Sequence, residues 1–295
     1  MRGGYLIKYE LRERARRCGI HLIAQDARPD FVDDPILLGY FTEDEPSADK
    51  AGRPDGRIVA RTESVCRMDP YHPTYVNLTP RWRNACAYAP VLDAVGADPY
   101  ASYITYNERS VADSTRALVA ATDGARPIWQ TLQAFHFRDN RVHPTPAELR
   151  HSIWSAVVHG ATGIGFWGVD VRNGFPDEEI RGLLSNAPLW APFKQSFRAV
   201  RHLSPVIMSK EPPGKPAACD NEHVALLNKR HRNNLYIFVL NMRSGRETAS
   251  LRLPVDSGKL VNQIEPGGTW AFKASRCDLD LAPLQPLVLM VEESQ

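Results

Sequence analysis

The stretch Pro35-Ile-Leu-Leu-Gly-Tyr-Phe-Thr-Glu-Asp-Glu-Pro46 decides how this chain can fold. It is an apolar run that ends abruptly in acidic residues and a proline, which is typical of a parallel strand buried on both faces. Folds built from parallel strands place their ligands at the carboxyl ends of those strands, where these acids stand. Glu45 is therefore the first candidate for chemistry. The alternative is that the acids form a solvated loop that starts the next helix.

The composition excludes several classes of protein. Of the 295 residues, 43% are hydrophobic and 24% are charged, which is enough apolar material for a large core. A formal net charge of +2, with scattered Lys and Arg, argues against a nucleic-acid partner. No apolar run approaches the roughly 20 residues of a membrane span. The first residues lack the apolar core of a signal peptide, and the sequence leaves the compartment open.

Strand-like runs alternate with amphipathic helical stretches through the first two thirds of the chain. Strands are expected at residues 19–25, in the run that ends at Glu45, and at 74–79, 94–99, 126–133 and 161–167. Helices are expected at residues 5–17, 57–68, 110–121, 146–159 and about 177–203. Repeating β/α units predict a parallel sheet with helices outside it. Strands short enough to be buried on both faces favour a barrel over an open sheet.

The helix expected at 146–159 has the clearest start. Thr145 can cap it, Pro146 suits the first helical position, and Glu148 completes a capping box. Gly160 follows its end. This segment is predicted to be the last barrel helix, leading into the strand at 161–167.

A second domain is expected after the proline-rich segment 210–216, which reads as a linker. Four strand-like runs follow it with turn residues and no helix between them, at residues 224–227, 235–240, 249–253 and 286–291. That pattern predicts a small antiparallel β-sandwich. The predicted fold class is thus α/β, a (β/α) TIM-type barrel over residues 1–207, followed by an all-β domain over residues 217–295.

Four pieces of sequence carry a resemblance to glycoside-hydrolase-type (β/α)8 barrels with a C-terminal β-sandwich. Residues 39–46 are similar to the (N/D)-E-P strand end that holds the acid of many such barrels, and Asp98-Pro-Tyr100 is similar to the D-x-Y end of a later strand. Residues 145–167 resemble the last helix and final strand, and Leu203-Ser-Pro-Val206 resembles the exit into the β-domain.

The same resemblance implies that the barrel is incomplete at its N-terminal end. It makes the strand ending at Glu45 the fourth of the barrel, with only one strand before it. Six strands are recognisable where a closed barrel has eight, so two are missing at the front. An unclosed barrel exposes unpaired strand edges. We expect a fragment that starts at an internal Met rather than a protein that closes by other means.

Two carboxylates are needed to hydrolyse a glycosidic bond. The resemblance gives Glu45 the acid role, with a pKa raised by burial and by the charges of neighbouring acids. It places the nucleophile at the end of the seventh strand, where this chain has Gln133, which cannot attack or act as a base. Asp98 is the best substitute, and Asp170 comes next. The alternatives are an Asp-Pro turn at Asp98 and an ordinary loop acid at Asp170.

Aromatic and amide side chains follow or end the expected strands and can line a sugar cleft. The aromatic candidates are Trp82, Tyr100, Tyr103, Phe135 and Trp167, and the amide candidates are Gln25, Asn77, Gln130 and Gln133. Aromatic rings are also ordinary core residues, and the amides can equally bond the barrel's own backbone. Neither the histidines nor the cysteines have metal-ligand spacing, and we expect no metal and no cofactor.

Two functions follow as hypotheses. The first is a glycoside hydrolase acting on an oligo- or polysaccharide, with Glu45 as general acid and Asp98 as its partner. The second is a non-catalytic or truncated carbohydrate-binding barrel, which the missing carboxylate at Gln133 and the missing front strands favour. The expected partner is a carbohydrate, with neither nucleic acid nor membrane, and the sequence leaves the oligomeric state open.

Overall fold

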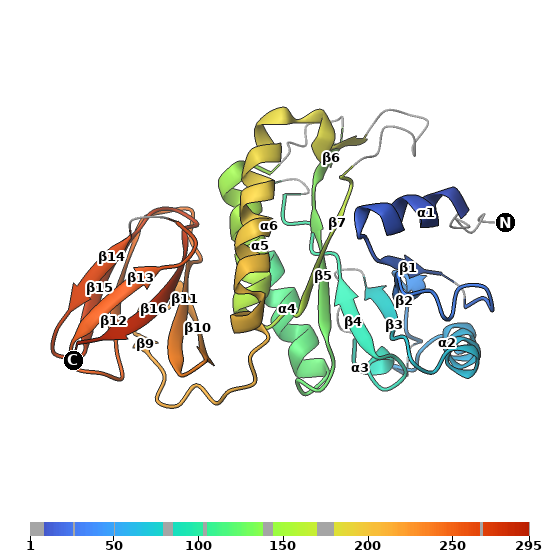
Figure 1. Cartoon of the computed structure of the whole chain (residues 1–295), viewed down its shortest axis with the longest axis horizontal. Coiled ribbons are helices and arrows are strands. Elements are labelled where there is room, and N and C mark those ends of the chain that lie inside the picture. The colour runs from blue at the N-terminus through green and yellow to red at the C-terminus, as the bar shows by residue number, and fades with distance from the viewer. Residues whose placement is uncertain are drawn as a thin grey trace. The chain divides into compact units, whose positions relative to one another are not determined.

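The computed structural model (Figure 1) describes residues 9–25, 27–49, 51–78, 85–102, 105–137, 144–169, 180–265 and 268–294. The chain forms two compact units, Met1–Pro99 with Ser114–Thr131, and Tyr100–Asp113 with Leu132–Gln295. Among the described residues, no helix combines the length and apolar character that crossing a membrane requires.

Six parallel strands form a half-barrel, so the prediction of an incomplete TIM-type barrel is confirmed. Their order in the sheet is β1 (Leu22–Ala24), β2 (Leu37–Asp44), β3 (Thr74–Leu78), β4 (Ala94–Ala97), β5 (Ile128–Gln133) and β7 (Gly163–Trp167). Each of the six coincides with a strand expected from the sequence. Strands β3 and β4 are buried at every position, as parallel strands covered on both faces must be.

The helices of the first unit cover its strands. They are α1 (Tyr9–Cys18), α2 (Gly56–Met68), α3 (Ala85–Tyr88) and, from Ser114 onward, α4 (Ser110–Ala121). Asp55 caps α2 by accepting a hydrogen bond of 2.9 Å from the backbone N–H of Arg57. Apolar side chains of α2, α3 and α4, among them Ile58, Tyr88 and Leu118, share one core cluster with the side chains of β3, β4 and β5.

Helix α5 (Pro146–Val158) begins with the predicted capping box. The Thr145 hydroxyl accepts from the backbone N–H of Glu148 at 3.2 Å, and the Thr145 backbone N–H donates to the Glu148 carboxylate at 2.7 Å. We expect Thr145→Ala to lower the free energy of unfolding by about 1 kcal/mol, because it removes this cap. Urea unfolding measures the loss. Thr145→Ser keeps the hydroxyl and serves as the control, and an equal loss in both variants would contradict the capping role.

The long helix expected from about residue 177 begins later, and the prediction is wrong for residues 180–186. Helix α6 spans Ala187–Ile207, and before it the chain forms β8 (Ile180–Gly182) and a 3-10 turn (Leu183–Ser185). β8 pairs antiparallel with β6 (Phe135–Phe137). A side chain at Gly182 would place its Cβ 2.5 Å from the carbonyl oxygen of Gly168. The backbone of Gly182 is extended, with φ −80° and ψ 171°, so the chain is not helical there, and residues 177–179 lie outside the described part of the chain.

The C-terminal strands form two antiparallel sheets, which confirms the predicted sandwich. One sheet contains β10 (Val224–His231), β11 (Asn234–Asn241), β16 (Pro286–Glu293), β13 (Gly258–Asn262) and β14 (Thr269–Phe272). The other contains β15 (Arg276–Leu281), β12 (Glu247–Arg252) and β9 (Ala218–Cys219). One apolar cluster draws residues from both sheets.

Helices α5 and α6 run side by side and pack against the sheet that contains β11 (Figure 1). Trp154 of α5 and Leu203 of α6 share a buried cluster with Phe238, Leu240 and Val288 of β11 and β16. These strands and helices belong to one compact unit. A division into domains at residues 207 and 217 stays a prediction.

Candidate active site

Glu45 stands directly after β2 in a backbone conformation that is unusual for its residue type. Its φ angle is 50°, in the left-handed region that favours glycine. Such strain persists only where the surroundings hold it. Here the backbone N–H of Glu45 donates a hydrogen bond of 2.7 Å to the carbonyl oxygen of Asn77. The side chain is exposed, so the expected burial of Glu45 is wrong.

Asp98 is the buried carboxyl of this site. It directly follows β4, and its backbone N–H donates to the carbonyl oxygen of Leu78 at 3.2 Å. Only 3% of the residue is exposed, and the Glu45 carboxyl lies near enough to act on its pKa. Within the described residues, its Oδ1 atom has no hydrogen-bond partner. The structure thus brings together the two residues that the sequence nominated for catalysis, both in the first unit.

Burial is the main cause that raises the pKa of Asp98, to about 7. The negative charge of Glu45 raises it further, and the charge of Asp44 adds to the effect. Asp98 therefore keeps its proton up to near-neutral pH, beside the negative charge of Glu45.

A third carboxylate, Asp44, is held beside the pair by Asn77. The Asn77 side-chain amide donates to Asp44 Oδ1 at 3.1 Å, and its own Oδ1 accepts from the Tyr75 hydroxyl at 3.3 Å. The Tyr75 ring lies 4.9 Å from the Trp129 ring, centroid to centroid. Gly96 leaves space for the Tyr75 ring, because a Cβ at position 96 would lie 2.7 Å from that ring. Hydrogen bonds and a ring contact therefore connect Asp44, through Asn77 and Tyr75, to Trp129 of β5.

The two glutamines of β5 are buried and bonded to other parts of the protein. Gln133 accepts from the backbone N–H of Ser102 at 2.9 Å and donates to the carbonyl oxygens of Ser102 at 3.3 Å and Phe135 at 3.0 Å. The Gln130 amide lies 2.9 Å from the Thr115 hydroxyl. These contacts agree with the alternative stated above, in which the glutamine amides bond groups of the barrel itself rather than a sugar.

Placing a carboxylate at position 133, where the family resemblance implies one, is expected to destabilise this protein. In Gln133→Glu, a carboxylate oxygen would face the two carbonyl oxygens that the amide now bonds. We expect a loss of about 1–3 kcal/mol in the free energy of unfolding, the cost of an unpaired buried group. Chemical denaturation measures it. Gln133→Met, which keeps the shape without new charge, is the control, and a fully stable glutamate variant would contradict the arrangement described.

The remaining candidates are placed as follows. Gln25 follows β1 and is half-buried, and its backbone oxygen accepts from Arg61 at 2.9 Å. In the second unit, half-buried Tyr100 and Trp167 flank buried Phe135, with ring centroids 5.0 and 4.6 Å from that of Phe135. Both rings meet Phe135 edge to face, at interplanar angles of 89° and 81°. An aromatic cluster of this kind suits a sugar ring as well as a core. Three further candidates, Trp82, Tyr103 and Asp170, lie outside the described residues.

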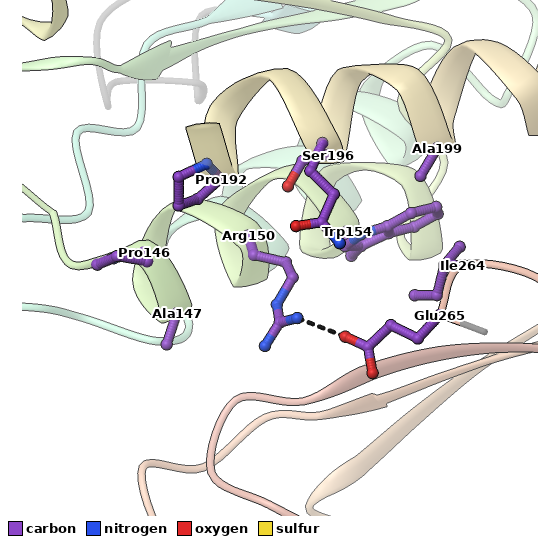
Figure 2. Close-up of a pocket in the computed structure, with 10 residues that line it drawn as sticks. Pro146, Ala147, Arg150, Trp154, Pro192, Ser196, Ala199, Ile264 and Glu265 are labelled. Atoms are coloured by element: carbon purple, nitrogen blue, oxygen red, sulfur yellow. Dashed lines mark hydrogen bonds and ion pairs between the residues drawn. The ribbon is translucent and has the colours of Figure 1, made fainter. Parts of the chain in front are cut away.

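The second unit also contains a hollow of about 290 Å³ beside α5 and α6 (Figure 2). Arg150 of α5 and Glu265, in the turn after β13, face each other across it, with 2.6 Å between Nη1 and Oε1. Trp154 and Ile264 line it as well. Both members of the ion pair are 36% exposed, so the pair contributes no more than about 1 kcal/mol. The hollow includes none of the carboxylates nominated from the sequence.

Comparisons with known proteins identify solved structures that share this fold. No protein-family model matches the sequence, and no curated protein matches it. Solved structures do match. An α-amylase from Geobacillus thermoleovorans, complexed with acarbose, superposes with a TM-score of 0.58 at 12% identity, covering 97% of this chain and 74% of the amylase. The fold is that of a glycoside-hydrolase barrel.

Other glycoside hydrolases share this barrel fold. A family 30 endoxylanase from Clostridium papyrosolvens matches 92% of this chain and 73% of its own, with a TM-score of 0.51 at 13% identity. A family 5 glycoside hydrolase from Bacteroides vulgatus matches 90% of this chain and 64% of its own, with a TM-score of 0.55 at 13% identity. The chain thus spans 64% to 74% of the lengths of these three enzymes.

Proposed function

We propose that this protein is a glycoside hydrolase acting on an oligo- or polysaccharide, with Glu45 and Asp98 as its acid. One observation carries the proposal: Asp98 is buried beside the exposed Glu45, and burial together with the charge of Glu45 raises the pKa of Asp98 to about 7. They follow parallel strands, at the end where barrels of this kind bind their ligands. The shared fold with glycoside hydrolases supports the same conclusion.

The two carboxyl groups act as one proton donor. Breaking a glycosidic bond requires a proton for the leaving oxygen. Because Glu45 is exposed and Asp98 is buried, the sugar meets the pair through Glu45. The proton of Asp98 moves onto Glu45 and then to the leaving oxygen. The pair is left with two negative charges, which stabilise the positive charge that develops on the sugar ring.

The second carboxylate of a glycosidase stands apart from its acid. Glycosidases hold their two carboxyl groups about 5–5.5 Å apart when one attacks the sugar, and about 6.5–9.5 Å apart when water does. Because the proposal assigns Glu45 and Asp98 together to the acid, another group must attack the sugar or activate water. Gln133 cannot fill that role. This observation favours a second candidate function, a carbohydrate-binding barrel without hydrolysis.

The wild-type protein separates the two candidates. It is assayed for release of reducing ends from malto-, xylo- and cello-oligosaccharides, and the same sugars are titrated into it by calorimetry. Hydrolysis supports the first function, and binding without hydrolysis supports the second. If the protein neither binds nor cleaves any of them, both are overturned for these sugars, and aryl glycosides of other sugars extend the same test.

A further inference from the structure

We propose that Asn77 is a positioning residue that holds two consecutive acids, Asp44 and Glu45, in the arrangement the active site needs. This inference rests on the proposed function. Asn77 is 5% exposed and lies opposite Asp44 in the parallel pairing of β2 with β3. Its backbone carbonyl accepts from the Glu45 N–H at 2.7 Å, and its side-chain amide donates to Asp44 Oδ1 at 3.1 Å.

The backbone carbonyl and the side-chain amide of Asn77 restrain different parts of the neighbouring acids. The backbone bond supports the left-handed conformation of Glu45, and it survives any change of the Asn77 side chain. The amide bond fixes only the Asp44 carboxylate. Asp44 is exposed, so without the amide its side chain is free to turn toward solvent. A change of the side chain at position 77 therefore acts on Asp44 while leaving the backbone bond in place.

Asparagine is suited to this position because it donates and accepts at once. Its amide nitrogen bonds the Asp44 carboxylate, and its oxygen accepts from the Tyr75 hydroxyl at 3.3 Å. An aspartate there would place a second negative charge against Asp44, and an alanine would leave both partners without their bond. Tyr75 therefore supports Asn77, and Asn77 supports Asp44.

Asn77 also affects the pKa of Asp98, because it acts on Asp44 and Glu45, whose charges raise that pKa. The charges that raise the pKa of Asp98 come from Glu45 and, to a smaller degree, Asp44. Burial raises the pKa of Tyr75, and the charges of Asp98 and Asp44 add to that effect. Holding Asp44 in place keeps its negative charge near Asp98. Releasing Asp44 weakens that influence, and the proton of the pair is then lost at lower pH.

The test measures the Asp98 carboxyl directly by carbon-13 NMR titration in three variants. Asn77→Ala is expected to lower the pKa of Asp98 by about half a unit, and Tyr75→Phe to lower it less. Asn77→Asp is expected to raise it, because it adds a negative charge. Opposite shifts from two substitutions at one position are not expected of a residue that only supports the fold. Asn234→Ala, on β11 of the sandwich, is the control.

If the wild-type protein hydrolyses a sugar, the same variants are also compared by enzyme kinetics. Asn77→Ala is expected to lower kcat about tenfold with little change in KM, because misplaced acids slow the chemical step more than binding. Unchanged titration of Asp98 in both Asn77 variants would overturn the positioning role while leaving the proposed hydrolase intact. Shifted titration in a protein that cleaves no sugar would retain the positioning role and reject the hydrolase.

Discussion

Replacing Glu45 by glutamine is expected to slow hydrolysis of a natural oligosaccharide by about 10²- to 10⁴-fold, the usual contribution of a general acid. A sugar hydroxyl is a poor leaving group and needs its oxygen protonated as the bond breaks. A dinitrophenolate leaves without a proton, so hydrolysis of a dinitrophenyl glycoside is expected to fall much less. The ratio of the two losses is the measurement, and it separates a missing acid from a damaged fold.

Two controls accompany the Glu45→Gln assay. Glu63→Gln changes an exposed acid of α2 that forms a 3.8 Å ion pair with Arg67, and it is expected to leave both rates unchanged. Asp98→Asn is expected to slow the oligosaccharide more than the dinitrophenyl glycoside, as Glu45→Gln does, because it removes the other half of the pair. Equal losses on both substrates, or no loss in Glu45→Gln, would remove Glu45 from the acid role.

The strands of the half-barrel were predictable because each is a short apolar run that ends in polar or turn residues. The capping box at Thr145 was predictable for a similar reason, since its residues are adjacent in the chain. Four strands of the sandwich escaped prediction, namely β9, β13, β14 and β15. In β15, Arg276–Leu281 alternates exposed and buried residues, and every second position is polar. Such alternation predicts a half-buried strand, so β15 was predictable from its pattern although it contains no continuous apolar run.

The acid pair was only half predictable. The sequence nominates Glu45 and Asp98 separately, since each ends a strand, but it assigns the burial to Glu45. In the structure Glu45 is exposed and Asp98 is buried. The register of β2 against β3 shifts between Phe41 and Glu43. A bulge of this kind changes the direction of the side chains that follow it, and no local pattern in the sequence predicts it. Which carboxyl keeps the proton depends on packing between distant segments.

Asp98→Asn is expected to make the protein more stable at pH 8 than the wild type. An ordinary aspartate has a pKa of 3.8, and the folded protein raises that of Asp98 to about 7. Below pH 3.8 both the folded and the unfolded chain hold this proton. As the pH rises toward 7 only the unfolded chain releases it, so the wild type loses stability over that interval. Asparagine does not titrate, and the variant avoids this loss.

The difference between the two proteins is expected to grow from near zero at pH 4 to about 2–4 kcal/mol at pH 8, since each pKa unit corresponds to about 1.4 kcal/mol. Urea unfolding at pH 4, 6 and 8 measures it, and parallel curves for the two proteins would show that Asp98 ionises as an ordinary carboxyl. In a Glu45→Gln background the gain from Asp98→Asn is expected to shrink, because the neighbouring negative charge is gone. That reduction measures the coupling between the two carboxyl groups without any substrate, so it tests the pair even in a protein that only binds its sugar.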